Sequence, residues 1–201
     1  MTRKNIPDAK NRILQAAVKI FAQKSFDGSR IDEIAAEAKV PKSLIYYHFK
    51  NKDEILEVLL QGFIREYTEL LQIAQNDTHQ MKAAKLPERM KHHYQEFFQQ
   101  NAGLIRIILI DSLKKSTKKP IIYQMVETLV DTDQKFTSDP EAYDRKERLV
   151  AEFFTNIIPN CAYLCFAESW IDYFDMEQKE FDTMFLRVIA ATHGVYHQNH
   201  Q

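Results

Sequence analysis

The spacing of apolar residues along this chain is that of helices. Apolar side chains three and four positions apart predict a first helix over residues 8–24. A capping pattern at Ser29 and Asp32 predicts a short second helix that ends near Lys39. A third helix is expected to begin at Pro41, because proline is favoured in the first turn of a helix.

The same period continues through the rest of the chain. Asn51 and Glu54 form a second capping pattern, which predicts a long helix from Lys52 to about Gln75. Further helices are predicted at residues 87–100, 102–115, 120–136, 143–174 and 177–197. Pro159 is expected to kink the longest of them. With only 4 glycines and no two-residue alternation, the sequence predicts an all-α protein of about nine helices.

Composition narrows the class of protein. Apolar residues make up 45% and charged residues 27% of the chain, as in ordinary soluble domains. The apolar run over residues 104–110 is broken by Arg106 and is far shorter than the roughly 20 residues of a membrane span. The basic N-terminus does not resemble a secretory signal, so a cytoplasmic location is expected. Cys161 and Cys165 lie in an apolar segment and are expected to be reduced.

Charge is distributed unevenly. Residues 1–52 carry eleven Lys and Arg against five Asp and Glu, a balance of +6, whereas residues 53–201 have a balance of −7. This asymmetry favours a small basic module that meets an anion, joined to a larger body that does not. We therefore expect a domain boundary between residues 52 and 53.

The stretch "PKSLIYYHFKNKDE", residues 41–54, indicates what the anion is. Two short helices joined by a tight turn describe a helix-turn-helix, whose second helix enters the major groove of DNA. Lys42 and Ser43 are placed to contact base edges in the first turn of that helix. The expected phosphate contacts are Tyr46, Tyr47, His48 and Lys52. On spacing alone, a solvated helix with some aromatic side chains in the core remains an alternative.

Three motifs in order resemble the DNA-binding domain of the TetR family of bacterial transcription regulators. They are "ILQAAVKIFAQKSF", "IDEIAAEAKV" and "PKSLIYYHFKNKDEIL", and together they cover about a quarter of the chain. The resemblance implies an N-terminal helix-turn-helix domain, followed by a helical domain for ligand binding and dimerisation that varies between members.

The resemblance also assigns roles to residues. It places Ser29 and Arg30 near the DNA backbone at the start of the second helix. Lys39 stands where the family usually has glycine; if this position requires positive φ, lysine is disfavoured there by about 1 kcal/mol, while its charge would assist at the DNA. Pro41 replaces a serine cap, and Leu44 replaces a threonine, so the operator sequence is left open.

One helix-turn-helix contacts only a few base pairs, so a symmetric dimer is expected. The last two helices carry more apolar surface than a terminal hairpin would leave exposed, and the resemblance implies that they pair with a second copy. The resemblance also implies that the middle helices bind a small-molecule effector, which the abundance of Met and Phe suggests is apolar or aromatic. Candidate lining residues, each also suited to simple packing, are Met90, Tyr94, Phe97, Phe98, Ile108, Met125, Phe154, Cys161 and Phe166.

Other chemistry is not expected. His193, His197 and His200 would be the histidines of a metal site, but a solvated C-terminal end is the favoured interpretation, so neither metal nor cofactor is predicted. No phosphate loop, zinc-protease motif or nucleophile elbow occurs, which argues against an enzyme. The resemblance implies a dimeric transcription regulator, a repressor released from a palindromic operator by its ligand. The alternative is an architectural or protein-interaction factor of the same fold with relaxed DNA specificity.

Overall fold

A computed structural model describes residues 8–80, 96–114, 120–134 and 144–199 of the chain. These residues form helices without any strand, which confirms the all-α prediction. The chain divides into two compact units, Met1–Arg65 and Glu66–Gln201. The boundary predicted between residues 52 and 53 lies in the first turn of α4 (Lys52–Gln80), which begins in the first unit and continues into the second.

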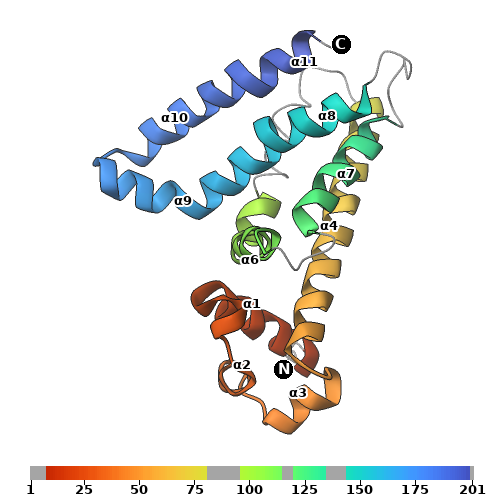
Figure 1. Cartoon of the computed structure of the whole chain (residues 1–201), viewed down its shortest axis with the longest axis vertical. Coiled ribbons are helices and arrows are strands. Elements are labelled where there is room, and N and C mark those ends of the chain that lie inside the picture. The colour runs from red at the N-terminus through yellow and green to blue at the C-terminus, as the bar shows by residue number, and fades with distance from the viewer. Residues whose placement is uncertain (1–7, 81–95, 115–119, 135–143, 200–201) are drawn as a thin grey trace, which may run out of the picture. The chain divides into compact units, whose positions relative to one another are not determined.

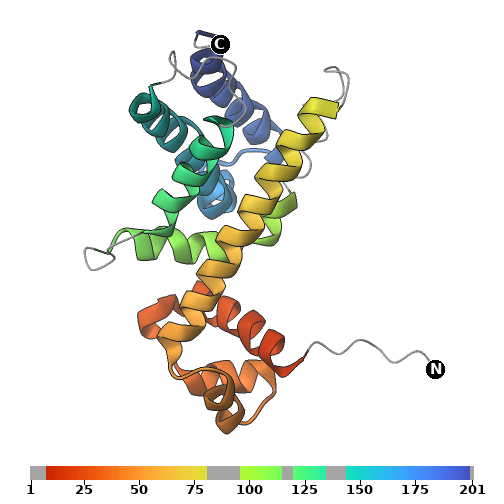
Figure 2. The ribbon, with the colours of Figure 1, turned by 90° about the vertical axis from the view of Figure 1, so that its right-hand side faces the viewer.

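The first unit is a small three-helix domain built against the start of α4. Its helices are α1 (Ala9–Gly28), α2 (Ile31–Ala38) and α3 (Lys42–His48), and Figure 2 shows them gathered around the first turns of α4. Each helix turns one apolar stripe inward, as helical spacing requires. The buried side chains include Ile13, Ala17, Ile20, Phe21, Ile34, Ala35, Ile45, Phe49 and Ile55.

The connection between α1 and α2 differs from the predicted one. Ser29 was expected to cap α2 but instead ends α1, where its Oγ donates a hydrogen bond to the Phe26 carbonyl (2.6 Å). Arg30 is the first cap residue of α2, and its backbone N–H donates to the Glu33 carboxylate at 3.0 Å. The prediction was off by one residue because glutamate at position 33 is the better reciprocal partner for a capping box.

The turn between α2 and α3 has the expected backbone. Lys39 adopts the left-handed conformation, φ 55° and ψ 47°, which explains why glycine is usually found there. Pro41 is the N-cap of α3 and offers no side-chain acceptor to the helix. Asn51 caps α4 as predicted, because its Oδ1 accepts the backbone N–H of Glu54 at 2.9 Å.

The second unit contains the remaining helices, labelled in Figure 1. They are α6 (Ala102–Ser112), α7 (Ile121–Gln134), α8 (Arg145–Glu152), α9 (Ile158–Phe174), α10 (Gln178–Ile189) and α11 (Val195–Asn199). Of the helix predicted at 87–100, residues 96–100 are helical and residues 87–95 lie outside the described part. α6 packs on α9 and α7 packs on α8, while α9 and α10 form an antiparallel hairpin (Figure 1).

Two π-helical turns interrupt the long C-terminal helices. The turn η1 (Phe153–Ile157) joins α8 to α9, and η2 (Ala190–Gly194) joins α10 to α11. Pro159 lies in the first turn of α9, directly after η1. Proline has no backbone N–H and so requires a distortion of the helix nearby, and η1 is such a distortion. A π turn adds one residue to the helix and shifts the faces of everything after it.

By length and composition, Arg145–Phe174 is the one helical stretch in the described ranges that could cross a membrane. A helix whose apolar face covers another protein surface has the same composition. The distribution of exposed apolar side chains on α9, described below, fits a helix that covers another protein surface.

Candidate DNA-binding surface and effector pocket

The recognition helix α3 separates its residues cleanly between core and solvent. Ile45 is fully buried and Phe49, just after the helix, is 2% exposed, so both anchor it to the domain. On the other side Tyr46 is 51% exposed and Tyr47 is 80% exposed. Large aromatic side chains are rarely left in water without a partner, so this face is suited to contact another molecule.

Lys42 and Ser43 begin the same helix and are exposed. The Lys42 Nζ atom lies 2.7 Å from the Asp32 carboxylate on α2. This hydrogen bond and the charge of Asp32 raise the pKa of Lys42 above its usual value. Lys42 is therefore charged, and its contact with DNA stays a prediction, which would require it to exchange Asp32 for a base or phosphate.

The residues that the family resemblance added fall into two groups. Arg30 and Lys39 are exposed, as a backbone contact requires. Ser29 is 4% exposed and its hydroxyl is engaged with Phe26, so its side chain belongs to the packing of the turn. His48 is half-buried, and its ring meets that of Tyr47 edge to face at 5.0 Å between centroids.

Lys52 has a role that the sequence analysis missed. Its ammonium group donates to the carbonyl oxygens of Phe26 (2.6 Å) and Ser29 (2.9 Å), and it lies 4.4 Å from the centroid of the Phe26 ring. These bonds tie the start of α4 to the end of α1. A phosphate contact by Lys52 stays a prediction, and it would use the remaining N–H of the ammonium group.

The predicted effector-binding residues do not gather around one cavity. Met90 and Tyr94 lie outside the described residues. Ile108, Met125 and Cys161 are buried in the core of the second unit, whereas Phe154 and Phe166 are 64% and 59% exposed. Phe97 and Phe98 are half-buried and pack with Tyr67, at 6.1 Å between ring centroids in both cases.

A pocket of about 490 Å³ does lie in the second unit, and Phe98 is the one predicted residue in its wall. Its lining residues are Tyr67, Phe98, Gln99, Leu129, Asn156, Ile157, Asn160, Tyr163, Leu164, Asp182, Phe185 and Leu186. The volume suits a small organic ligand, and the wall combines apolar side chains with a few amides and one carboxylate.

The carboxylate in this wall is held by its neighbours. The Tyr163 hydroxyl donates to Asp182 at 2.6 Å, and the Gln178 side chain donates to the same oxygen at 2.8 Å. Burial, followed by the contact with Asp182, raises the pKa of Tyr163 to about 12, so its hydroxyl stays protonated. The pocket wall thus contains polar groups held in place by hydrogen bonds, together with apolar side chains.

An apolar groove runs along α9 and α10 and shares Tyr163 and Phe185 with the pocket. Its most exposed members are Phe166, Trp170, Tyr173, Phe174, Met184 and Val188. Soluble single chains seldom expose so continuous an apolar strip, which marks it as a surface that another protein covers. Cys165 lies on this helix and Cys161 is buried, where burial raises the pKa of Cys161 to about 12 and keeps the thiol unreactive.

The three-helix domain, with its exposed aromatic face on α3 and its left-handed turn before it, defines a helix-turn-helix DNA-binding protein. Residues 13–59 match the family model of bacterial regulatory proteins of the tetR family. This match and the similarities below support a transcriptional regulator of the tetR family.

Named relatives agree with this assignment. The chain is similar to the biofilm operon icaADBC HTH-type negative transcriptional regulator IcaR of Staphylococcus epidermidis, with 29% identity over 31% of this chain and 34% of that protein. IcaR of Staphylococcus aureus strain Newman is 24% identical over 80% of this chain and 81% of that protein. The fold resembles that of the transcriptional regulator FadR from Bacillus subtilis in complex with stearoyl-CoA. Its TM-score is 0.54 at 17% identity, over 89% of this chain and 96% of that one.

Proposed function

We propose that this protein is a dimeric, sequence-specific repressor in the cytoplasm that a small-molecule effector releases from a palindromic operator. The observation that carries the proposal is the exposed face of α3, where Tyr46 and Tyr47 stand in solvent above a helix anchored by Ile45 and Phe49. Lys42 and Ser43 would contact bases, and Tyr46, Tyr47 and His48 would contact phosphates.

The apolar groove on α9 and α10 supports a dimer through the last two helices. A second copy of the same hairpin would cover Phe166, Met184 and Val188 and form a four-helix arrangement around a twofold axis. Pairing two recognition helices about one turn of DNA apart would then give a palindromic site.

The 490 Å³ pocket supports an effector with an apolar body and a polar group. Tyr67, Phe98 and Leu129 would pack on the apolar part, and Asn156, Asn160 and Asp182 would meet the polar part. The stearoyl-CoA bound to FadR from Bacillus subtilis shows that this fold accommodates a long apolar chain in that protein. Release follows if the effector binds the DNA-incompetent form more tightly, because the two binding events are then linked.

The test starts from genomic fragments selected by the purified protein. Fluorescence anisotropy then measures the affinity for the selected site and for a scrambled duplex over a range of salt concentrations. The ratio of the two affinities gives the specificity, and the salt dependence gives the contribution of charge to binding. We expect tight binding to the selected site, weak binding to the scrambled one, and a steep negative slope of log affinity against log salt. Equal affinity for both duplexes would instead favour the architectural factor.

A further inference from the structure

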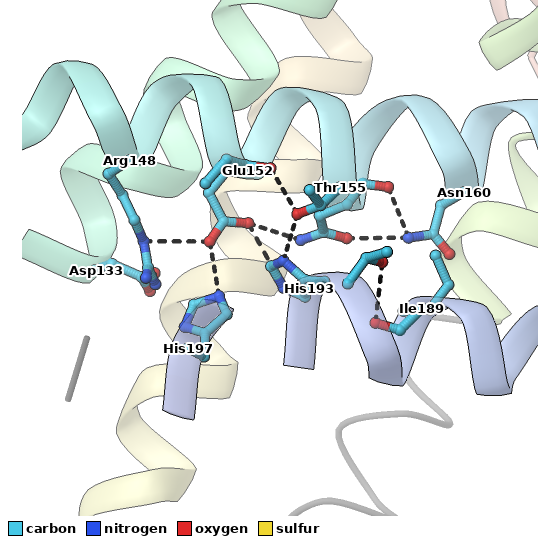
Figure 3. A network of polar contacts seen from close by, with 11 residues as sticks. Asp133, Arg148, Glu152, Thr155, Asn160, Ile189, His193 and His197 are labelled. Atoms are coloured by element: carbon cyan, nitrogen blue, oxygen red, sulfur yellow. Dashed lines mark hydrogen bonds and ion pairs between the residues drawn. The ribbon is translucent and has the colours of Figure 1, made fainter. Parts of the chain in front are cut away.

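One cluster of polar side chains in the second unit belongs to neither the DNA surface nor the wall of the effector pocket. Glu152 is the last residue of α8, His193 lies in the π turn η2, and His197 lies one helical turn further, in α11. Figure 3 shows both imidazole rings turned toward the same carboxylate. The π turns η1 and η2 pack on each other beside this cluster, and such turns are frequent at functional sites.

The donor atoms are close enough to share one ion. His197 Nε2 lies 3.0 Å from Glu152 Oε1, and His193 Nε2 lies 3.8 Å from Glu152 Oε2. All three candidate ligand atoms fall within 4.8 Å of one another. An ion bonded at about 2.1 Å to tetrahedral ligands holds neighbouring donors about 3.4 Å apart, which lies between the two measured separations.

The orientation of His193 is fixed by Thr155. The Thr155 hydroxyl donates its single proton to the Ala151 carbonyl at 2.7 Å, and its oxygen lies 3.0 Å from His193 Nδ1. His193 Nδ1 must therefore carry a proton and donate it to Thr155. Burial lowers the pKa of His193, which favours the neutral ring. A neutral ring protonated at Nδ1 directs the lone pair of Nε2 at the Glu152 carboxylate, and the two groups repel each other. A cation bound between them would remove this repulsion.

Glu152 is equipped to remain ionised in a buried position. Only 1% of its surface is exposed, and Asn156 donates to its Oε2 at 2.9 Å while Arg148 Nε lies 3.2 Å from its Oε1. Burial alone would raise the pKa of Glu152, but the bonds from His197 and Asn156 and the nearby positive charges outweigh it and lower the pKa. The charge of Arg148 is in turn balanced by Asp133 at 3.1 Å.

We propose that Glu152, His193 and His197 form a binding site for a divalent first-row transition-metal ion. Two imidazoles and one carboxylate are the ligand set that Zn²⁺, Co²⁺ and Ni²⁺ accept, and one or more coordination positions would remain for water. Mg²⁺ and Ca²⁺ prefer oxygen ligands and should bind poorly. Asn156, Arg148 and Thr155 act as positioning residues, because each holds a ligand through a hydrogen bond or ion pair.

The competing account is an ion-paired network that needs no metal, in which His197 donates to Glu152 and the cluster serves packing alone. The two accounts differ in what the purified full-length chain does with metal salts in the absence of DNA. The measurement therefore does not depend on the proposed repressor function.

The experiment uses chelator-treated protein and ZnCl₂, with Kd measured by competition against a chromophoric zinc chelator. CoCl₂ serves as a spectroscopic probe, because tetrahedral coordination by nitrogen and oxygen gives visible absorption bands. We expect one Zn²⁺ per protomer, cobalt bands that ZnCl₂ abolishes, a higher Tm with zinc, and no such effects with MgCl₂.

Variants separate the site from adventitious binding. His193→Ala and His197→Ala should each weaken zinc binding by about tenfold or more, and Thr155→Val should weaken it by a smaller factor. His48→Ala is the matched control, since it removes a histidine from the other unit and should leave zinc binding unchanged. If the wild-type protein shows no stoichiometric zinc binding, or if the His193→Ala/His197→Ala double variant binds zinc as the wild type does, the metal site is refuted. Circular dichroism of each variant confirms that it is folded.

Discussion

The two units of this protein place their polar chemistry in opposite ways. In the first unit the ion pairs Lys19–Glu37 and Lys42–Asp32 lie on the surface, and the core is largely apolar. In the second unit a carboxylate with 1% exposure, Glu152, lies at the centre of a network of side chains from α8, η1, η2 and α11 (Figure 3). An exposed pair can change partners at little cost, whereas a buried network commits the fold to one arrangement.

This difference fits the tasks that we propose for the two units. A DNA-contacting surface must exchange its internal partners for phosphates and bases, so loosely held charges are an advantage there. A unit that binds an effector or a metal needs donors held in place before the ligand arrives. Asn156 lines the effector pocket and also donates to Glu152, so the two proposed sites of the second unit share one residue.

The largest effect should come from Glu152→Ala. This change removes the acceptor of Asn156 and His197 and breaks the buried ion pair with Arg148, which costs about 3–5 kcal/mol of unfolding free energy. Urea unfolding followed by circular dichroism measures the loss. Glu37→Ala, which breaks an exposed ion pair of the first unit, is the control and should leave stability nearly unchanged. Equal losses in both variants would contradict the contrast between the units.

The next effect concerns the groove of α9 and α10. Val188 is 60% exposed in the single chain, and Val188→Arg would bring two like charges together across the proposed twofold interface, at a cost of several kcal/mol to the dimer. Sedimentation velocity should show a folded monomer, and affinity for the full palindrome should fall with it. Phe185 and Ile189 are poorer targets, because both are partly buried and Phe185 packs on Tyr163 at 4.8 Å between ring centroids. A Val188→Arg protein that remains dimeric would exclude this groove as the interface.

On the DNA side, Lys42→Ala and Asp32→Asn should act in opposite directions. Loss of Lys42 should lower operator affinity by about tenfold and relax discrimination at one base pair. Asp32→Asn frees Lys42 from its internal partner and removes a negative charge near DNA, so affinity should rise for operator and scrambled duplexes alike. Anisotropy titrations at one salt concentration measure both effects. A lower affinity for Asp32→Asn would mean that the ion pair positions Lys42 for binding.

Lys52→Met tests the residue whose role the structure changed most. Two charge-assisted hydrogen bonds to the carbonyls of Phe26 and Ser29 are lost, which should lower stability by about 1–2 kcal/mol. If Lys52 also contacts a phosphate, the salt slope of DNA binding becomes less steep by roughly one. A stability loss with an unchanged slope would make Lys52 purely structural.

These residues show which parts of the fold and of the candidate sites can be predicted from the sequence. Helical spacing and capping patterns identified α1, α3 and the start of α4, because those signals lie within a few residues of each other. Sequence could not place Lys52 against Phe26, 26 positions away, or His197 against Glu152, 45 positions away. The dismissal of His193 and His197 as a solvated end followed from the same limit, since their carboxylate partner lies on a different helix.

The residues that line the effector pocket were harder still to predict from the sequence, because of a local feature of the backbone. Helical counting through residues 153–157 assumes 3.6 residues per turn, but η1 is a π turn and shifts the faces that follow it. Phe154 and Phe166 were candidates for the effector cavity, and both are exposed. Pro159 predicted a distortion of the helix in this region, but it did not indicate that the distortion would be a π turn.

The smallest expected effect compares one strained backbone position from each unit. Lys39 and Asp175 both adopt the left-handed conformation, at φ 55° and 51°. Lysine is disfavoured there by roughly 1 kcal/mol, whereas aspartate tolerates the region better because its short side chain bonds locally. Lys39→Gly should therefore raise the free energy of unfolding by about 1 kcal/mol and Asp175→Gly by less, as measured by urea unfolding. Lys39→Ala removes the same charge without relieving strain and should leave stability unchanged. If it stabilises as much as Lys39→Gly, charge and not backbone strain is the cost at this turn, and Lys39 would be kept for its contact with DNA.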